Sequence, residues 1–106
     1  MGRRRIPIKD FPDPVDTLVG KPVEASTDLH GLDARTAEVQ LEAFLTRFSR
    51  SRPGAVVRVI TGRGNRSDGG AVLKPLVRTL LEGRLAGLVQ RYTTEVGGGA
   101  YLVQVR

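Results

Sequence analysis

Two short motifs carry the residue types that phosphodiester chemistry needs. Asp28 and the chain's one histidine, His30, stand two residues apart in the sequence Asp-Leu-His-Gly. About thirty residues later, the sequence Thr-Gly-Arg-Gly at 61–64 places Arg63 between two glycines. Because side chains alternate along a strand, Asp28 and His30 should lie on one face of it. A carboxylate, an imidazole and a cationic turn brought together could hold and cut a phosphodiester.

Asp28 and His30 admit two kinds of chemistry, and their residue types leave both open. In a metal-free mechanism, His30 is the general acid or base and Arg63 stabilises the charge that develops on the phosphate. In a metal-assisted mechanism, Asp28 and the substrate phosphate hold Mg²⁺ or Mn²⁺. A further protein ligand would then come from one of three carboxylates, Glu24, Asp68 or Glu95. A third possibility is structural, with Asp28 only orienting the histidine.

The glycines of the second motif have two interpretations. Backbone N–H groups could approach a phosphate closely near a helix N-terminus, or the glycines could serve a tight turn that needs positive φ. The loop is not a Walker P-loop, since Gly-Lys-Ser/Thr is missing, and Ser67 stands where a dinucleotide fingerprint has its third glycine. A nucleotide cofactor is therefore not expected. The predicted phosphate-binding residues of this loop are Thr61, Gly62, Arg63 and Gly64.

Hydrophobic periodicity predicts the elements that position these motifs. Residues 23–29 and the β-branched run 55–60 predict two strands, one before each motif. Asp33 is a good N-cap for a helix that runs to about residue 51. This helix has one apolar face at period 3.6, formed by Ala37, Leu41, Phe44, Leu45 and Phe48.

The second half of the chain predicts a further helix and two strands. The helix covers about 72–82, and its regular part is expected to start close to Pro75, because proline is tolerated in a first turn. Residues 87–92 and 100–105 predict the strands, joined by a glycine-rich loop.

The predicted order is β-α-β-α-β-β, which makes the fold α/β: a two-layer sandwich with a four-stranded mixed sheet and two helices. The first two strands are expected to be parallel and the last two to form a hairpin. Ligands of such sheets bind beyond the carboxyl ends of the parallel strands. Both motifs follow those ends, so they should meet if the two strands are neighbours.

Composition sets limits on the class of protein. With 106 residues the chain fits one domain, here 23–106, preceded by an extended arm at 1–22 that contains four prolines. It has no cysteine, which excludes disulfides and thiolate metal sites and fits a cytoplasmic protein. No apolar segment follows the N-terminal arginines to make a signal peptide, and none is long enough to span a membrane.

The charge points to nucleic acid. The net charge is +6, the pI is about 10.8, and residues 47–66 contain six arginines and no acid. We expect this stretch to face phosphates, although an ordinary solvated surface is the simpler alternative. Only 5% of the residues are aromatic, which argues against a stacking platform for single strands. Besides Arg63, the arginines predicted to follow the nucleic-acid backbone are Arg47, Arg50, Arg52 and Arg66.

Residues 27–106 resemble the Smr (small MutS-related) domain. The family signature Leu-Asp-x-His stands here as Thr-Asp-Leu-His at 27–30, and Thr/His-Gly-x-Gly stands at 61–64. The helix start at 72–77 and the glycines at 97–99 are also typical. Thr27 replaces the usual leucine. It should face away from the cleft and affect packing, not chemistry.

The resemblance implies a fold similar to the C-terminal domain of translation initiation factor 3. It also implies a nucleic-acid role, since Smr domains include nicking DNA endonucleases, RNA endonucleases and factors of ribosome-associated quality control. The family's catalytic residues map onto Asp28 and His30, and its phosphate loop maps onto 62–64. No MutS-type ATPase or clamp region is found, so a stand-alone bacterial Smr protein is expected.

Three functions remain open at this stage. The first is an endonuclease that cleaves DNA or RNA. The second is a non-catalytic module that binds RNA or the ribosome in DNA repair or translation quality control. The third is a structural domain that docks a protein partner.

Overall fold

The computed structural model describes residues 18, 20–62 and 70–106. Of the predicted N-terminal arm, only residues 18 and 20–22 fall within this range. The loop positions Arg63, Gly64, Arg66 and Asp68 lie outside it.

The elements follow the predicted order. After β1 (Val23–Asp28) come α2 (Ala34–Ser51), β2 (Val56–Ile60) and α3 (Gly70–Glu82). A short 3₁₀ turn (Ala86–Leu88) then leads into β3 (Val89–Thr94) and β4 (Ala100–Val105).

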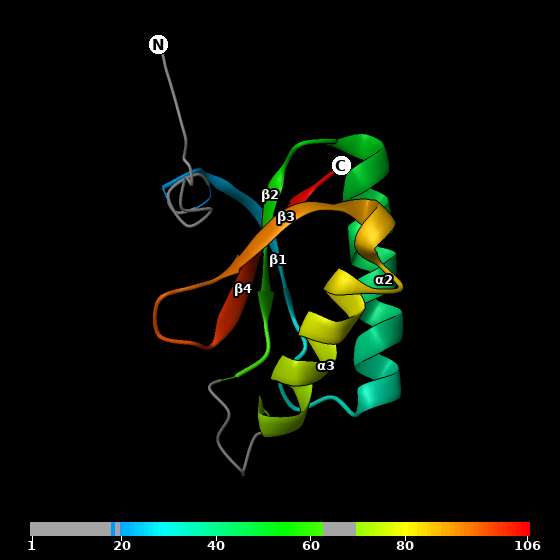
Figure 1. Ribbon diagram of the computed structural model, residues 1–106, viewed down its shortest axis with the longest axis vertical. Coiled ribbons are helices and arrows are strands. Elements are labelled where there is room, and N and C mark those ends of the chain that lie inside the picture. Colours follow the sequence, from blue (N-terminus) through cyan, green and yellow to red (C-terminus); the bar gives the residue numbers. More distant parts are fainter. Residues whose placement is uncertain (1–17, 19, 63–69) are drawn as a thin grey trace.

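The four strands form one mixed sheet in the order β1-β2-β4-β3. β1 and β2 are parallel, whereas β4 is antiparallel to both of its neighbours. The two helices lie on the same side of the sheet (Figure 1). The two-layer α/β fold, the parallel first pair and the final hairpin are therefore confirmed.

Helix α2 begins and packs as its sequence predicts. The Asp33 side chain accepts a hydrogen bond of 2.8 Å from the Thr36 N–H, which satisfies one of the free donors of the first turn. Ala37, Leu41 and Leu45 are buried against the sheet and α3. Burial of this face fixes the direction of α2 across the sheet.

Helix α3 corrects one prediction, because it begins at Gly70 and not close to Pro75. Pro75 therefore lies inside the helix, where it cannot donate to the carbonyl four residues earlier. Apolar packing compensates for this loss, since Leu73, Val77 and Leu81 are almost completely buried in the main core. The early start extends the helix back towards the loop that follows β2.

The sheet face away from the helices carries a small second cluster. Leu18 is fully buried there against Val56 and Leu102, with Val23 packed beside them. The chain just before β1 thus covers part of this face. In the described part of the chain, neither helix is long and apolar enough to cross a bilayer.

Candidate functional site

The two sequence motifs meet because their strands are neighbours. In the parallel pair, Asp28 at the end of β1 lies beside Ile60 at the end of β2. The Leu29 N–H donates to the Ile60 carbonyl at 2.8 Å, so the pairing continues one residue past β1. Both strands point to the end of the molecule where α2 and α3 begin (Figure 1). The predicted convergence at the carboxyl ends of the strands is present for the described part of the second motif, Thr61 and Gly62.

A tight turn exposes His30. The Leu32 N–H donates to the Leu29 carbonyl at 3.0 Å, and Gly31 has φ +83°, as the third residue of a type II turn requires. Leu29 is fully buried and anchors the turn in the core. The side chains of His30 and Asp28 are 52% and 58% exposed. They lie on the solvent side, with Leu29 on the other, as strand alternation predicts.

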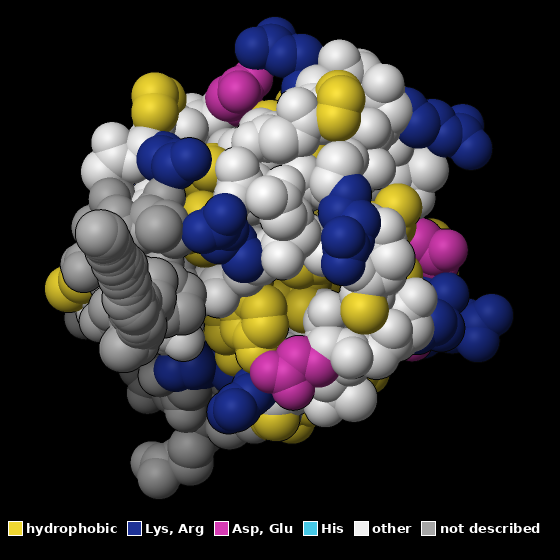
Figure 2. Space-filling view, turned by 45° about the horizontal axis from the view of Figure 1, so that its top comes forward, with side chains coloured by type: hydrophobic (Ala, Val, Ile, Leu, Met, Phe, Trp, Pro, Cys, Tyr) yellow, Lys and Arg dark blue, Asp and Glu magenta, His cyan; other side chains and the backbone are white. Residues whose placement is uncertain are grey.

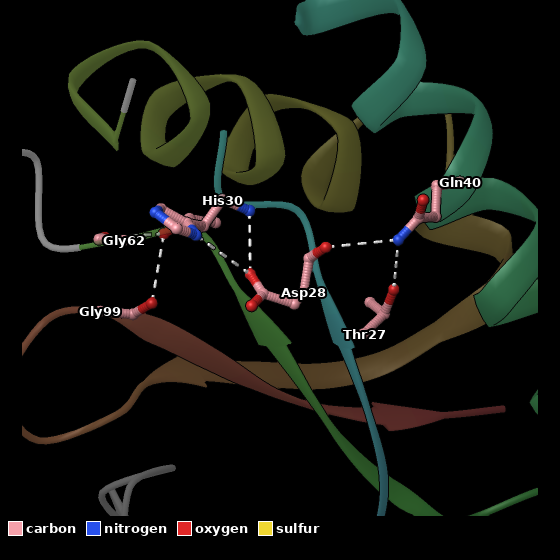
Figure 3. Close-up of polar contacts among 7 residues, drawn as sticks. Thr27, Asp28, His30, Gln40, Gly62 and Gly99 are labelled. Carbon is pink, nitrogen blue, oxygen red and sulfur yellow. Dashed lines mark hydrogen bonds and ion pairs between the residues drawn. The ribbon is translucent and has the colours of Figure 1, made fainter. Parts of the chain in front are cut away.

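The Asp28 carboxylate organises this turn. Its Oδ1 accepts a hydrogen bond of 3.0 Å from the His30 backbone N–H and lies 4.0 Å from His30 Nδ1 (Figure 3). The second distance is longer than a hydrogen bond, so the two side chains interact through charge when the imidazole is protonated. Asp28 thus holds the backbone of His30 and faces its ring.

Gln40 supports the pair from α2, and nothing in the sequence pattern indicated it. Its Nε2 donates to Thr27 Oγ1 at 3.0 Å and to the Asp28 carbonyl at 3.4 Å (Figure 3). Thr27 is buried and lies on the opposite face of β1 from Asp28. The threonine that replaces the family's leucine therefore has a polar partner. Only the packing of α2 on β1 brings Gln40 to this position.

The turn after β2 is held by the β3–β4 loop. The N–H groups of Thr61 and Gly62 both donate to the Gly99 carbonyl, at 2.9 and 3.1 Å, and Gly62 has φ +90°. Thr61 is fully buried, and its hydroxyl donates to the Gly62 carbonyl. These two N–H groups are therefore already bonded within the protein. Of the two interpretations of the glycines, the turn with positive φ applies at Gly62, and Thr61 shapes that turn from inside.

Lys74 brings a cation to this end of the molecule. A Cβ placed on Gly98 would lie 3.3 Å from Lys74 Nζ, so the ammonium group contacts the loop that holds the Thr61–Gly62 turn. Lys74 is not among the predicted site residues. A sequence pattern could have indicated it: a lysine near the start of a helix that follows a glycine-rich loop, a position where anions bind.

Two of the three predicted further metal ligands, Glu24 and Glu95, are paired with arginines. Glu24 pairs with Arg52 at 2.6 Å near the start of β1, and Glu95 binds Arg58 through two hydrogen bonds of 2.9 and 2.7 Å. Among the described residues, no group of three His, Cys, Asp or Glu side chains is placed to hold a metal ion. Asp68, the remaining predicted ligand, lies outside the described range. Within the described part of the chain, Asp28 therefore has no second carboxylate partner for a metal.

Three of the predicted phosphate-binding arginines lie at the other end of the molecule. Helix α2 has 18 residues and is about 27 Å long, and it runs from the Asp28 end to Arg47, Arg50 and Arg52. Arg47 lies over the Phe48 ring at 5.7 Å, and Arg52 pairs with Glu24. Figure 2, which turns this end towards the viewer, shows Lys and Arg side chains spread over the surface and not gathered in one patch. These arginines are not part of the Asp28 site.

Comparison with known proteins assigns the family. The Smr domain model matches residues 27–106, most of the chain. The chain therefore belongs to the Smr domain family, which is a family of nucleic-acid-binding domains of the nuclease type. A search of curated proteins found no match.

Proposed function

We propose that the chain is an endonuclease that cleaves phosphodiester bonds of DNA or RNA at Asp28 and His30. The observation that supports this most is the exposed carboxylate–imidazole pair. It is fixed by a backbone hydrogen bond at the carboxyl ends of two parallel strands, where ligands of α/β sheets bind. The match to a nuclease-type family adds to this support.

In the proposed reaction, neutral His30 takes a proton from water as the water oxygen attacks phosphorus. The ester P–O bond then breaks, and the leaving oxygen takes up a proton from the His30 imidazolium or from solvent. On RNA, the neighbouring 2′-hydroxyl can replace water and leave a cyclic phosphate. Asp28 stabilises the imidazolium that forms, and Lys74 and Arg63 stabilise the negative charge on the phosphate. Asp28 is the residue that would hold Mg²⁺ or Mn²⁺ if a metal took part, and the metal would then supply an activated water.

The geometry restricts how a nucleic acid can use the arginines. Arg47, Arg50 and Arg52 are about one helix length from the Asp28 end. They can contact the same molecule only if it spans about the length of α2. We therefore propose that a short substrate is held by the Asp28 end alone, and that the arginines contribute only to longer polymers.

A cleavage assay tests the proposal. Wild type and His30→Ala would be incubated with supercoiled plasmid and with a structured RNA, each in Mg²⁺, Mn²⁺ or EDTA. We expect wild type to cleave one of the polymers and His30→Ala to lose cleavage while its affinity stays within a few-fold. Lys21→Ala is the matched control, since it removes an exposed charge just before β1 and is not one of the predicted nucleic-acid-binding residues. Equal cleavage by wild type and His30→Ala would refute the assignment.

A second candidate is a non-catalytic module that binds RNA or the ribosome. It is favoured by the 4.0 Å gap between Asp28 and His30 and by the open, solvent-exposed position of both side chains. This function predicts salt-sensitive binding that His30→Ala leaves unchanged, with no cleavage by either protein.

A further inference from the structure

The two tyrosines of the chain line one pocket. Tyr92 of β3 and Tyr101 of β4 pack edge to face, with ring centroids 5.7 Å apart. Together with Arg78, Thr93 and Thr94 they surround an open cavity of about 380 Å³ between α3 and the edge strand β3. This volume lies within the range of small-molecule sites.

The pocket offers ring surface and hydrogen-bonding groups together. Tyr92 is half-buried and donates a hydrogen bond to Glu82, which also pairs with Arg78 at 3.5 Å. Burial raises the pKa of Tyr92, and the hydrogen bond to Glu82 adds to this effect, so the phenol keeps its proton. The Glu82 carboxylate, hydrogen-bonded to Tyr92, and the Arg78 guanidinium paired with it thus lie beside an aromatic ring. Donors and acceptors beside a ring are what the edge and face of a nucleobase require.

Lys74 connects this pocket to the candidate active site. Its carbonyl accepts a hydrogen bond of 3.0 Å from the Tyr101 hydroxyl, and its ammonium group lies at Gly98. Arg78 follows four residues later, about 6 Å further along α3. A strand with a phosphate at Lys74 could therefore reach His30 in one direction and the pocket in the other.

We propose that the pocket between α3 and β3 binds an unpaired base of the nucleic acid whose phosphates lie at Lys74 and His30. This inference rests on the proposed nucleic-acid function of the Asp28 end. It assigns that site a substrate class, a single-stranded or locally unpaired segment, since a base inside a duplex cannot enter the pocket. The low aromatic content argued against a stacking platform for single strands. The structure brings the two tyrosines of the chain into contact, so one base could still stack there.

The binding test compares two substitutions of one residue. Tyr92→Phe keeps the ring and removes the hydroxyl, whereas Tyr92→Leu removes the ring. Affinities for a labelled single strand of about eight nucleotides, as DNA and as RNA, and for its blunt duplex would be measured by fluorescence anisotropy. We expect Tyr92→Leu to weaken single-strand binding about tenfold, Tyr92→Phe to stay within twofold, and duplex binding to be the same for all three proteins. Thermal unfolding of each variant checks that it is folded.

Intrinsic fluorescence gives a second, independent readout. The chain has no tryptophan, so its emission comes from Tyr92 and Tyr101 alone. A base stacked in the pocket should quench this emission as the single strand is added. Binding that is seen by anisotropy and weakened by salt, but without quenching and without a Tyr92→Leu effect, would overturn the base pocket and leave the proposed function standing. No binding of any oligonucleotide would overturn both.

Discussion

The two ends of the sheet both carry charged side chains, but different forces hold them. At the carboxyl ends of β1 and β2, the Asp28 carboxylate is fixed by a backbone N–H, and the turn beside it is held by hydrogen bonds to Gly99. At the opposite end, Arg52 is neutralised by Glu24. The arginine-rich stretch of the sequence therefore shows only where positive charge lies. The hydrogen-bonded turns at the ends of β1 and β2 indicate the candidate site.

Removal of the Asp28 charge should produce the largest difference between the two ends. In Asp28→Asn, the amide oxygen can still accept from the His30 N–H, so the turn stays intact while the charge facing the imidazole is lost. We expect the cleavage rate to fall about 100-fold. Glu24→Gln is the matched control, because it removes a carboxylate from the other end of the same strand. Equal rates for both variants would show that the Asp28 carboxylate has no part in the reaction.

A lysine pair tests where phosphates bind. Lys74→Met should weaken nucleic-acid binding and reduce the slope of log affinity against log salt by about 0.7 to 0.9, the value for one phosphate contact. Lys21→Met removes the same charge just before β1 and should leave the slope unchanged. Binding titrations at four or more salt concentrations measure both. A larger change for Lys21→Met would move the phosphate site to the other end of the molecule.

Two glycines with positive φ, one at each end of the sheet, allow the effect of backbone strain on stability to be separated from an effect on cleavage. Gly31 and Gly54 have φ +83° and +87°, and a Cβ on either would meet open space. Alanine at each position should therefore cost about 1 to 2 kcal/mol of unfolding free energy through backbone strain alone. Only Gly31→Ala should also reduce cleavage, since its turn carries His30. Urea unfolding and cleavage rates check this, and loss of activity in Gly54→Ala would mean that stability limits the reaction.

The sequence predicted most of the fold because its signals are local. Strand periodicity, the Asp33 N-cap and the apolar face of the helix after it are each read from a few neighbouring residues, and the structure confirms the elements they predict. The meeting of the Asp28 and Thr61 motifs also followed from local signals, given one assumption about strand neighbours. The error at Pro75 arose because tertiary burial of α3 outweighs one lost hydrogen bond.

The parts of the site that the sequence did not reveal depend on contacts between distant segments. Gln40 reaches Asp28 across 12 residues of sequence, and Lys74 reaches the Gly98 loop from another element. The pairing of Glu95 with Arg58 joins residues 37 apart and removes a predicted metal ligand. No periodicity or spacing signals such contacts, since they arise only when the sheet order is fixed.

The smallest expected effect concerns pH and the N-cap that begins α2 at the Asp28 end. Hydrogen bonds from Thr36 hold the pKa of Asp33 below its usual value of 3.8. Because the folded-state pKa is lowered, the stabilisation is complete above the unfolded pKa and is lost as the pH falls through the folded one. Asp33→Asn keeps a capping oxygen that does not titrate.

We therefore expect Asp33→Asn and wild type to have similar stability near pH 7, and wild type to lose more stability than the variant below about pH 4. Urea unfolding from pH 7 to pH 2.5 measures the difference. Parallel curves for the two proteins would show that the cap does not depend on the carboxylate charge. In that case the Thr36 N–H is satisfied equally well by a neutral oxygen, and the start of α2, with the Gln40 contact that depends on it, is insensitive to acid.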